Sequence, residues 1–91
     1  MSVEQQAKIF SALSDPTRLR IVQALQAAEK EMTGSELVEK AGISGLALLC
    51  HHWKILEEAG LISKKREGQS MLCSLNRELL DHSMHCLTNS H

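Results

Sequence analysis

The segment from Ser44 to Leu61, SGLALLCHHWKILEEAGL, constrains the chain most, because its pattern describes one complete helix with two different faces. Ser44 belongs to the residue types that cap helix N-termini, and Gly60 stands where a left-handed glycine often ends a helix. Large apolar residues at helical spacing predict a buried face: Leu49, Trp53 and Leu56. Small, polar or cationic side chains predict an exposed face: Ala47, Cys50, His51 and Lys54.

After Gly60 the period of apolar residues changes from helical to alternating. Residues 61–66 and 70–75 flank Glu67-Gly68-Gln69, which predicts a two-stranded hairpin with a short glycine-containing loop. Lys64, Lys65 and Arg66 lead to the tip of this hairpin. A helix with a small polar front, followed by a turn and two short strands, is typical of a helix that reads DNA.

Two helices are predicted at the start of the chain. Residues 4–13 have apolar residues at helical spacings. Asp15-Pro16 opens the next helix, because Asp caps helices well and Pro suits the first helical position. This second helix is expected to fray near residues 27–29.

A helix-turn-helix follows. Thr33 and Glu36 form a capping box that opens a short helix, and Gly42 ends it. A tight turn then leads into the DNA-reading helix, and two helices joined in this way form a helix-turn-helix. After the hairpin, Asn76 caps a last helix that is predicted over residues 77–87.

In this order the elements predict a winged helix-turn-helix, and the chain resembles the ArsR/SmtB family of small bacterial sensor repressors. The segments that carry the resemblance are LSDPTRLRI at 13–21, HHWKILEEAGLI at 51–62, REGQ at 66–69 and CSL at 73–75. The resemblance covers nearly the whole chain. It implies a mainly α fold with a small β-hairpin, in which residues 1–91 form a single DNA-binding domain and the helices at both ends form a dimer interface. It also implies a homodimeric repressor that leaves its operator, an inverted repeat in double-stranded DNA, when an unidentified signal arrives.

The chain departs from the family pattern at the start of the DNA-reading helix. Gly45 to Cys50 separate Ser44 from His51-His52 by one residue more than is usual, and the segment 45–49 is more apolar. The register at the start of this helix is therefore left open.

The resemblance places His51 and His52 beside the DNA backbone, with ordinary packing or solvation as the alternative. For Lys54 two interpretations are equally favoured: a contact with a DNA phosphate, or a solvated lysine on the surface. The hairpin cations are better evidence, because they cluster in a chain whose net charge is −1. The predicted DNA-binding residues are Ser44, Ala47, Cys50, His51, His52, Lys54, Lys64, Lys65, Arg66 and Gln69.

A winged helix of this length lacks enough chain to cover the apolar sides of its first and last helices. Pairing two copies would bury them. The predicted dimer-interface residues are Ile9, Phe10, Leu80, Met84 and Leu87.

The sequence offers a weak case for a divalent metal. A Cys-x-Cys sensor site, common in the family, is replaced here by Thr33-Gly34-Ser35, which has no thiolate for a soft metal. The last helix has a compact set of candidate ligands, Asp81, His82, His85 and Cys86. Upstream on the hairpin, where the family has further ligands, stands Met71. An exposed polar helix end is therefore favoured over a metal site, although two subunits could assemble ligands from two such sets.

The thiols leave a second route to a signal open. Cys50 on the expected DNA face and Cys86 on the last helix are candidate sensors, since a neighbouring cation lowers the pKa of a thiol. Cys73 alternates with Met71 and Leu75 and is expected to be a small buried residue.

Composition excludes several classes of function. Aromatic residues make up 2% of the chain, too few for a stacking platform that binds single-stranded nucleic acid. No catalytic Ser/His/Asp set or phosphate-binding glycine loop is present, so an enzyme is not expected. Three cysteines without a signal segment favour the cytoplasm, and no apolar run is long enough for a membrane. The alternative to a DNA-binding regulator is a winged-helix module that acts only through protein–protein contact.

Overall fold

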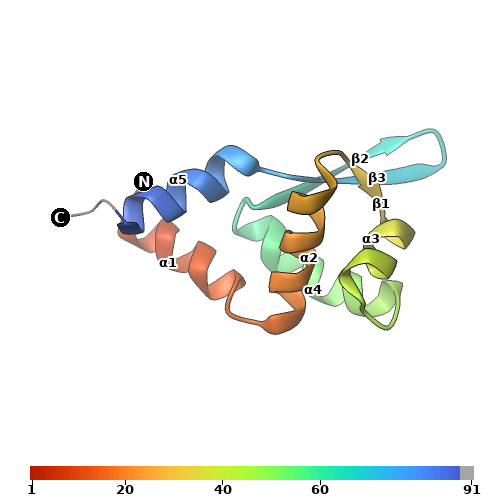
Figure 1. The fold of residues 1–91 in the computed structure, drawn as a ribbon, viewed down its shortest axis with the longest axis horizontal. Helices are drawn as coiled ribbons and strands as arrows, with labels where there is room; N and C mark the ends of the chain where they lie inside the picture. Colours follow the sequence, from red (N-terminus) through yellow and green to blue (C-terminus); the bar gives the residue numbers. More distant parts are fainter. Residues whose placement is uncertain (89–91) are drawn as a thin grey trace.

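The structure, a computed structural model, describes residues 1–88 and contains five helices and three strands in that range (Figure 1). In chain order these are α1 (Val3–Ala12), α2 (Pro16–Ala28), β1 (Met32–Thr33), α3 (Gly34–Ala41), α4 (Leu46–Glu58), β2 (Ile62–Glu67), β3 (Ser70–Leu75) and α5 (Arg77–Thr88). The predicted fold class, mainly α with a hairpin after a helix-turn-helix, is confirmed.

Most predicted helix ends are confirmed by their capping bonds. The Oδ2 atom of Asp15 accepts from the backbone N–H groups of Thr17 and Arg18 at 2.9 and 3.1 Å, which starts α2. Thr33 and Glu36 form both bonds of the capping box at the start of α3. These bonds satisfy N–H groups that have no partner inside the helix.

The predicted cap at Ser44 is wrong. Helix α4 begins at Leu46, its N-cap residue is Gly45, and no side chain bonds to its first turn. The first intrahelical bond, from Leu49 N to Gly45 O, shows that the additional residue in this segment moves the helix start past Ser44. The other end agrees with the prediction, because Gly60 follows the helix with φ +80°, a conformation that suits glycine.

The sheet has one strand more than predicted. Its order is β1-β3-β2, and both pairings are antiparallel. Strand β1 has two residues, too few to show an alternating pattern, and it pairs Met32 with Cys73 and Thr33 with Leu72. The hairpin turn is shorter than predicted, because Glu67 belongs to β2 and only Gly68 and Gln69 lie outside the strands.

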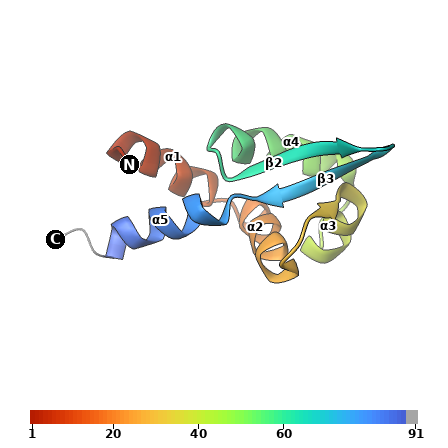
Figure 2. The ribbon, with the colours of Figure 1, turned by 90° about the horizontal axis from the view of Figure 1, so that it is seen from above.

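The core lies where α2, α3 and α4 meet one side of the sheet. Among its members that are at most 1% exposed are Ile9, Ile21, Leu25, Leu37, Leu56 and Leu61. Helices α1 and α5 extend from this core toward the same end of an elongated molecule that measures 46 × 23 × 21 Å (Figures 1 and 2). Gln6 Nε2 in α1 donates to the carbonyl oxygen of Ser83 in α5 at 3.1 Å.

The predicted dimer-interface residues fall into two groups. Ile9 and Leu80 are buried within the chain itself. Phe10 is half-buried, whereas Met84 and Leu87 are exposed on α5 at 46% and 57%. Only the second group is placed to meet another molecule.

Two neighbouring residues on α4 test the core. Leu56 is fully buried and Ile55 is 39% exposed. We expect Leu56→Ala to lower the free energy of unfolding by about 2–5 kcal/mol, because it leaves a cavity. Ile55→Ala, the matched control, should change it by about 0.5 kcal/mol. Urea denaturation of both variants measures the difference, and equal losses would contradict the buried position of Leu56.

Candidate nucleic-acid interface

Helix α4 presents an exposed front and a buried back. The back is formed by Leu49, His52, Trp53 and Leu56, each at most 8% exposed. The front contains Ala47, Cys50, His51 and Lys54, all of them exposed. Leu46, which the sequence did not single out, also lies exposed in the first turn, at 52%. Four of the six predicted contacts between Ser44 and Lys54 therefore share one helix face, and Ser44 is exposed in the turn before it.

His52 does not share that face. Its ring is buried, and its Nδ1 atom lies 3.2 Å from Nη1 of Arg18 in α2. A guanidinium can only donate, so Nδ1 is the acceptor in this contact. Adjacent residues on a helix point about 100° apart, which explains why His51 is exposed while His52 is not. The structure thus separates two residues that the sequence analysis treated together.

Arg18 connects the start of α2 to α4. Its Nε donates to the carbonyl oxygen of Ala12 at 2.7 Å while its Nη1 faces His52. Asp15 stands beside this pair, with Oδ2 3.8 Å from His52 Nδ1. The backbone N–H of Arg18 is the main reason that the pKa of Asp15 lies below its usual range. The sequence carried no local signal for this connection, because Arg18 and His52 lie 34 residues apart.

Strand geometry divides the three cations of the hairpin between two faces. Successive side chains on a strand point to opposite sides of the sheet. Lys64 pairs in register with the buried Cys73, and its Nζ lies 5.9 Å from the centroid of the Trp53 ring. Lys65 instead forms an ion pair with Glu31, Nζ to Oε1 at 3.3 Å. Arg66, two residues after Lys64, is exposed on the same side of the sheet as Lys64.

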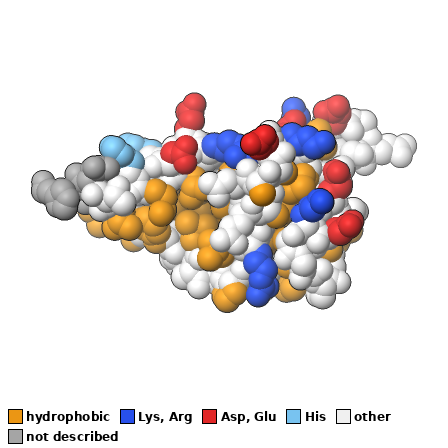
Figure 3. All heavy atoms as spheres, in the orientation of Figure 1, with side chains coloured by type: hydrophobic (Ala, Val, Ile, Leu, Met, Phe, Trp, Pro, Cys, Tyr) orange, Lys and Arg blue, Asp and Glu red, His pale blue; other side chains and the backbone are white. Residues whose placement is uncertain are grey.

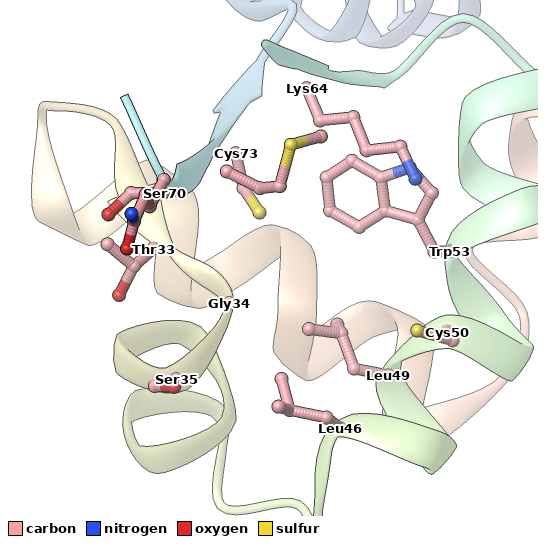
Figure 4. Close-up of a pocket in the computed structure, with 12 residues that line it drawn as sticks. Thr33, Gly34, Ser35, Leu46, Leu49, Cys50, Trp53, Lys64, Ser70 and Cys73 are labelled. Atoms are coloured by element: carbon pink, nitrogen blue, oxygen red, sulfur yellow. The ribbon is translucent and has the colours of Figure 1, made fainter. Parts of the chain in front are cut away.

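A hollow of about 410 Å³ lies between one side of α4, the start of α3 and the hairpin, and Cys50 is the one residue of the α4 front that lines it (Figure 4). Its walls include Leu46, Leu49 and Trp53 from α4, and Lys64 and Cys73 from the hairpin. Gln69, predicted to contact DNA, also lines it. The hollow therefore borders both parts of the candidate interface.

Comparisons with known proteins agree with the helix-turn-helix fold described above. The family signature described as a helix-turn-helix domain matches residues 13–64. The transcriptional repressor SdpR of Bacillus subtilis (strain 168) is 37% identical over 81 residues, which cover 89% of this chain and 87% of SdpR. The crystal structure of an ArsR family transcriptional regulator superposes with a TM-score of 0.78 and 27% identity, covering 99% of this chain and 90% of that one.

The chain belongs to the ArsR/SmtB family.

The family consists of DNA-binding transcriptional regulators rather than enzymes. A further structural neighbour is the homodimeric winged helix-turn-helix DNA-binding domain of a Mycobacterium bovis protein, with a TM-score of 0.72. It is 22% identical and covers 98% of this chain and 86% of the neighbour, so it supports the fold. Within residues 1–88, no helix is long and apolar enough to cross a membrane.

The candidate metal ligands of this ArsR/SmtB chain do not form one set. His82 and Cys86 approach each other, with Nε2 3.6 Å from Sγ. Asp81 and His85 do not complete a site with them, since no group of three His, Cys, Asp or Glu side chains suited to one ion occurs among residues 1–88.

The three thiols have different surroundings. Cys50 is exposed on the front of α4, and Cys86 is half-buried on α5. Cys73 is buried, as expected, and burial raises the pKa of its thiol although Lys64 opposes the shift. Of the candidate sensors, Cys50 is the more accessible.

The adjacent histidines of α4 make a matched pair. His52→Ala removes the hydrogen-bond partner of Arg18, so we expect it to lower the free energy of unfolding by about 1–3 kcal/mol. His51→Ala should leave stability nearly unchanged, because that ring is exposed. Chemical denaturation of the two variants compares them. A larger loss for His51→Ala would contradict the buried Arg18–His52 contact.

Proposed function

We propose that this chain is a homodimeric repressor that contacts double-stranded DNA through the front of α4 and the hairpin. The observation that carries the proposal is the exposed front of a firmly packed α4 next to cations on the hairpin, in a member of a repressor family. The front of α4 is small at Ala47 and Cys50 and polar or cationic at His51 and Lys54. Such a face suits insertion into a major groove, where short side chains allow the helix to approach the bases.

The hairpin supplies phosphate contacts in this proposal. Lys64 and Arg66 project from the side of β2 that borders the hollow beside α4. Lys65 projects from the other side and is already paired with Glu31. We therefore assign the larger part of the electrostatic contact to Lys64 and Arg66, and a smaller part to Lys65.

The double variant Lys64→Ala/Arg66→Ala should weaken binding to every DNA sequence. Each lost phosphate contact reduces the slope of log K against log salt by about 0.9, so the slope should fall by about 2. Lys65→Ala should change it by less than half as much. Fluorescence anisotropy with labelled duplexes, titrated at several salt concentrations, measures both quantities.

Lys8→Ala on α1 is the control for loss of positive charge alone, and its slope should equal that of the wild type. An unchanged slope in the double variant would remove the hairpin from the interface. No salt-dependent binding by the wild type would remove DNA as the partner and favour a module that acts through protein contact.

We propose that the dimer forms through α1 and α5. Figure 3 shows hydrophobic side chains gathered over this end of the molecule. Val3 is 77% exposed and Met84 46%, large apolar surfaces for a monomer of this size. The homodimeric Mycobacterium bovis domain, with the same fold, supports the pairing. A two-fold axis here would place two copies of α4 about 34–36 Å apart, which is one turn of DNA, and such a dimer would suit an inverted-repeat operator.

Met84→Glu should convert the dimer into a monomer that binds the inverted repeat weakly, because it places charge in the contact. Leu19→Glu is the matched control, since Leu19 is 40% exposed on α2. Analytical ultracentrifugation at micromolar concentration gives the mass of each variant. A wild type that sediments as a monomer would contradict the dimer proposal.

We propose that the signal acts on the face that meets DNA or on the spacing of the two subunits. A thiol modification at Cys50 would add bulk or charge to the front of α4, and one at Cys86 would alter α5. A divalent metal held by His82 and Cys86 with help from a second subunit remains part of this hypothesis. Free thiols at all three cysteines fit a reducing compartment, and we propose the cytoplasm.

A further inference from the structure

The hollow beside α4 has the size of a small-molecule site. Its volume of about 410 Å³ lies within the range of pockets that hold such ligands. Leu46 and Leu49 point from α4 into the space before the start of α3, and the Trp53 indole forms an adjoining wall (Figure 4). Most of its lining is therefore apolar, and a ligand would need an apolar body to fill it.

Small side chains keep this space open. Gly34 and Ser35 line it on α3, and Cys73 lines it on the hairpin, opposite the larger residues of α4. A Cβ atom on Gly34 would come within 3.2 Å of Leu46 Cδ2, so the two helices already approach closely beneath the hollow. The hollow is thus a consequence of residue sizes on three elements rather than of a gap in a loose loop.

Charge at the hollow has one sign. Lys64 is the only ionisable side chain with a full charge at neutral pH among the described residues that line it. Its side chain extends over the Trp53 ring (Figure 4), and among residues 1–88 no carboxylate lies within ion-pair distance of it. Lys65, the next residue, has Glu31 as its partner. The ammonium group of Lys64 can therefore receive an anion.

The indole N–H of Trp53 lacks a hydrogen-bond acceptor among residues 1–88. Its Nε1 is the one buried side-chain nitrogen or oxygen in the described part of the chain that has no hydrogen-bond partner. A buried donor without an acceptor is unfavourable, and such groups are rare in folded proteins. The nitrogen is itself buried, so an acceptor in the hollow could reach it only after the side chains that cover it move.

We propose that the hollow binds a small carboxylic acid with an apolar body, such as a short alkyl chain or a single aromatic ring. The apolar body lies between Leu46, Leu49 and Trp53, and the carboxylate lies at Lys64. The proposal also extends the proposed function, because the ligand takes Lys64 away from DNA and fills the space beside Cys50. Ligand and DNA then compete, and the acid acts as an inducer.

Trp53 is the only tryptophan in the sequence, so its fluorescence reports on the hollow without any DNA. We would titrate the full chain with octanoate and, as uncharged match, octanamide, with acetate as control for ionic strength. Octanoate should change the emission saturably and bind about five- to tenfold more tightly than octanamide, the effect of one charge-assisted contact. Acetate should have no saturable effect.

Lys64→Gln should lower the affinity for octanoate to that for octanamide, whereas Lys65→Gln, on the other side of the strand, should bind octanoate like the wild type. Equal affinities of octanoate for the two variants would overturn the placement. No saturable change with octanoate in the wild type would overturn the site itself.

A second measurement tests the competition. Saturating octanoate should raise the Kd of the wild type for labelled duplex DNA by about tenfold or more, an increase typical of coupled sites. An unchanged Kd would overturn the role as inducer while the fluorescence site stands. If the chain does not bind DNA at all, the proposed function fails, and the tryptophan titration still decides the ligand site independently.

Discussion

The burial of one side of α4 holds the rest of this architecture in place. Leu56 is fully buried, and Trp53 and Leu49 pack beside it against α2, α3 and the sheet. Because these side chains fix the rotation of the helix about its axis, the residues on the opposite side of the helix must face outward. The exposed front of α4 is thus set by the packing of its back. The contact between Arg18 and His52 adds a directional hydrogen bond to this non-directional packing.

The alternation of side chains along β2 likewise determines which of its cations share a face of the sheet. A run of three cations looks like one patch in the sequence, but the pleat of the strand sends Lys65 away from its neighbours. Lys65 then serves to join the hairpin to Glu31 in the segment before β1, while Lys64 covers Trp53. The three consecutive cations therefore lie on two faces of the sheet and make different contacts, because successive side chains of the strand point to opposite sides.

Features that depend on neighbouring residues could be predicted from the sequence. The caps at Asp15, Thr33 and Asn76 each involve groups within three residues, and their hydrogen bonds are present. Features that depend on distant partners could not. Strand β1 exists because Met32 meets Cys73, far along the chain, and a two-residue strand has no periodicity of its own. The burial of His52 likewise follows from Arg18, 34 residues away. Ser44 failed as a cap for a local reason, the extra residue that moves the start of α4 to Leu46.

The order β1-β3-β2 leaves β2 at an edge of the sheet. An edge strand exposes unpaired N–H and C=O groups to which a strand from another molecule can add, and this is a common start of aggregation. Here the exposed strand contains Lys64, Lys65 and Arg66 in succession, so an approaching copy of the same strand would meet three like charges. The basic residues of the hairpin therefore also protect the protein from its own edge. This protection limits how far the hairpin could lose its positive charge, independently of the DNA contact proposed for it.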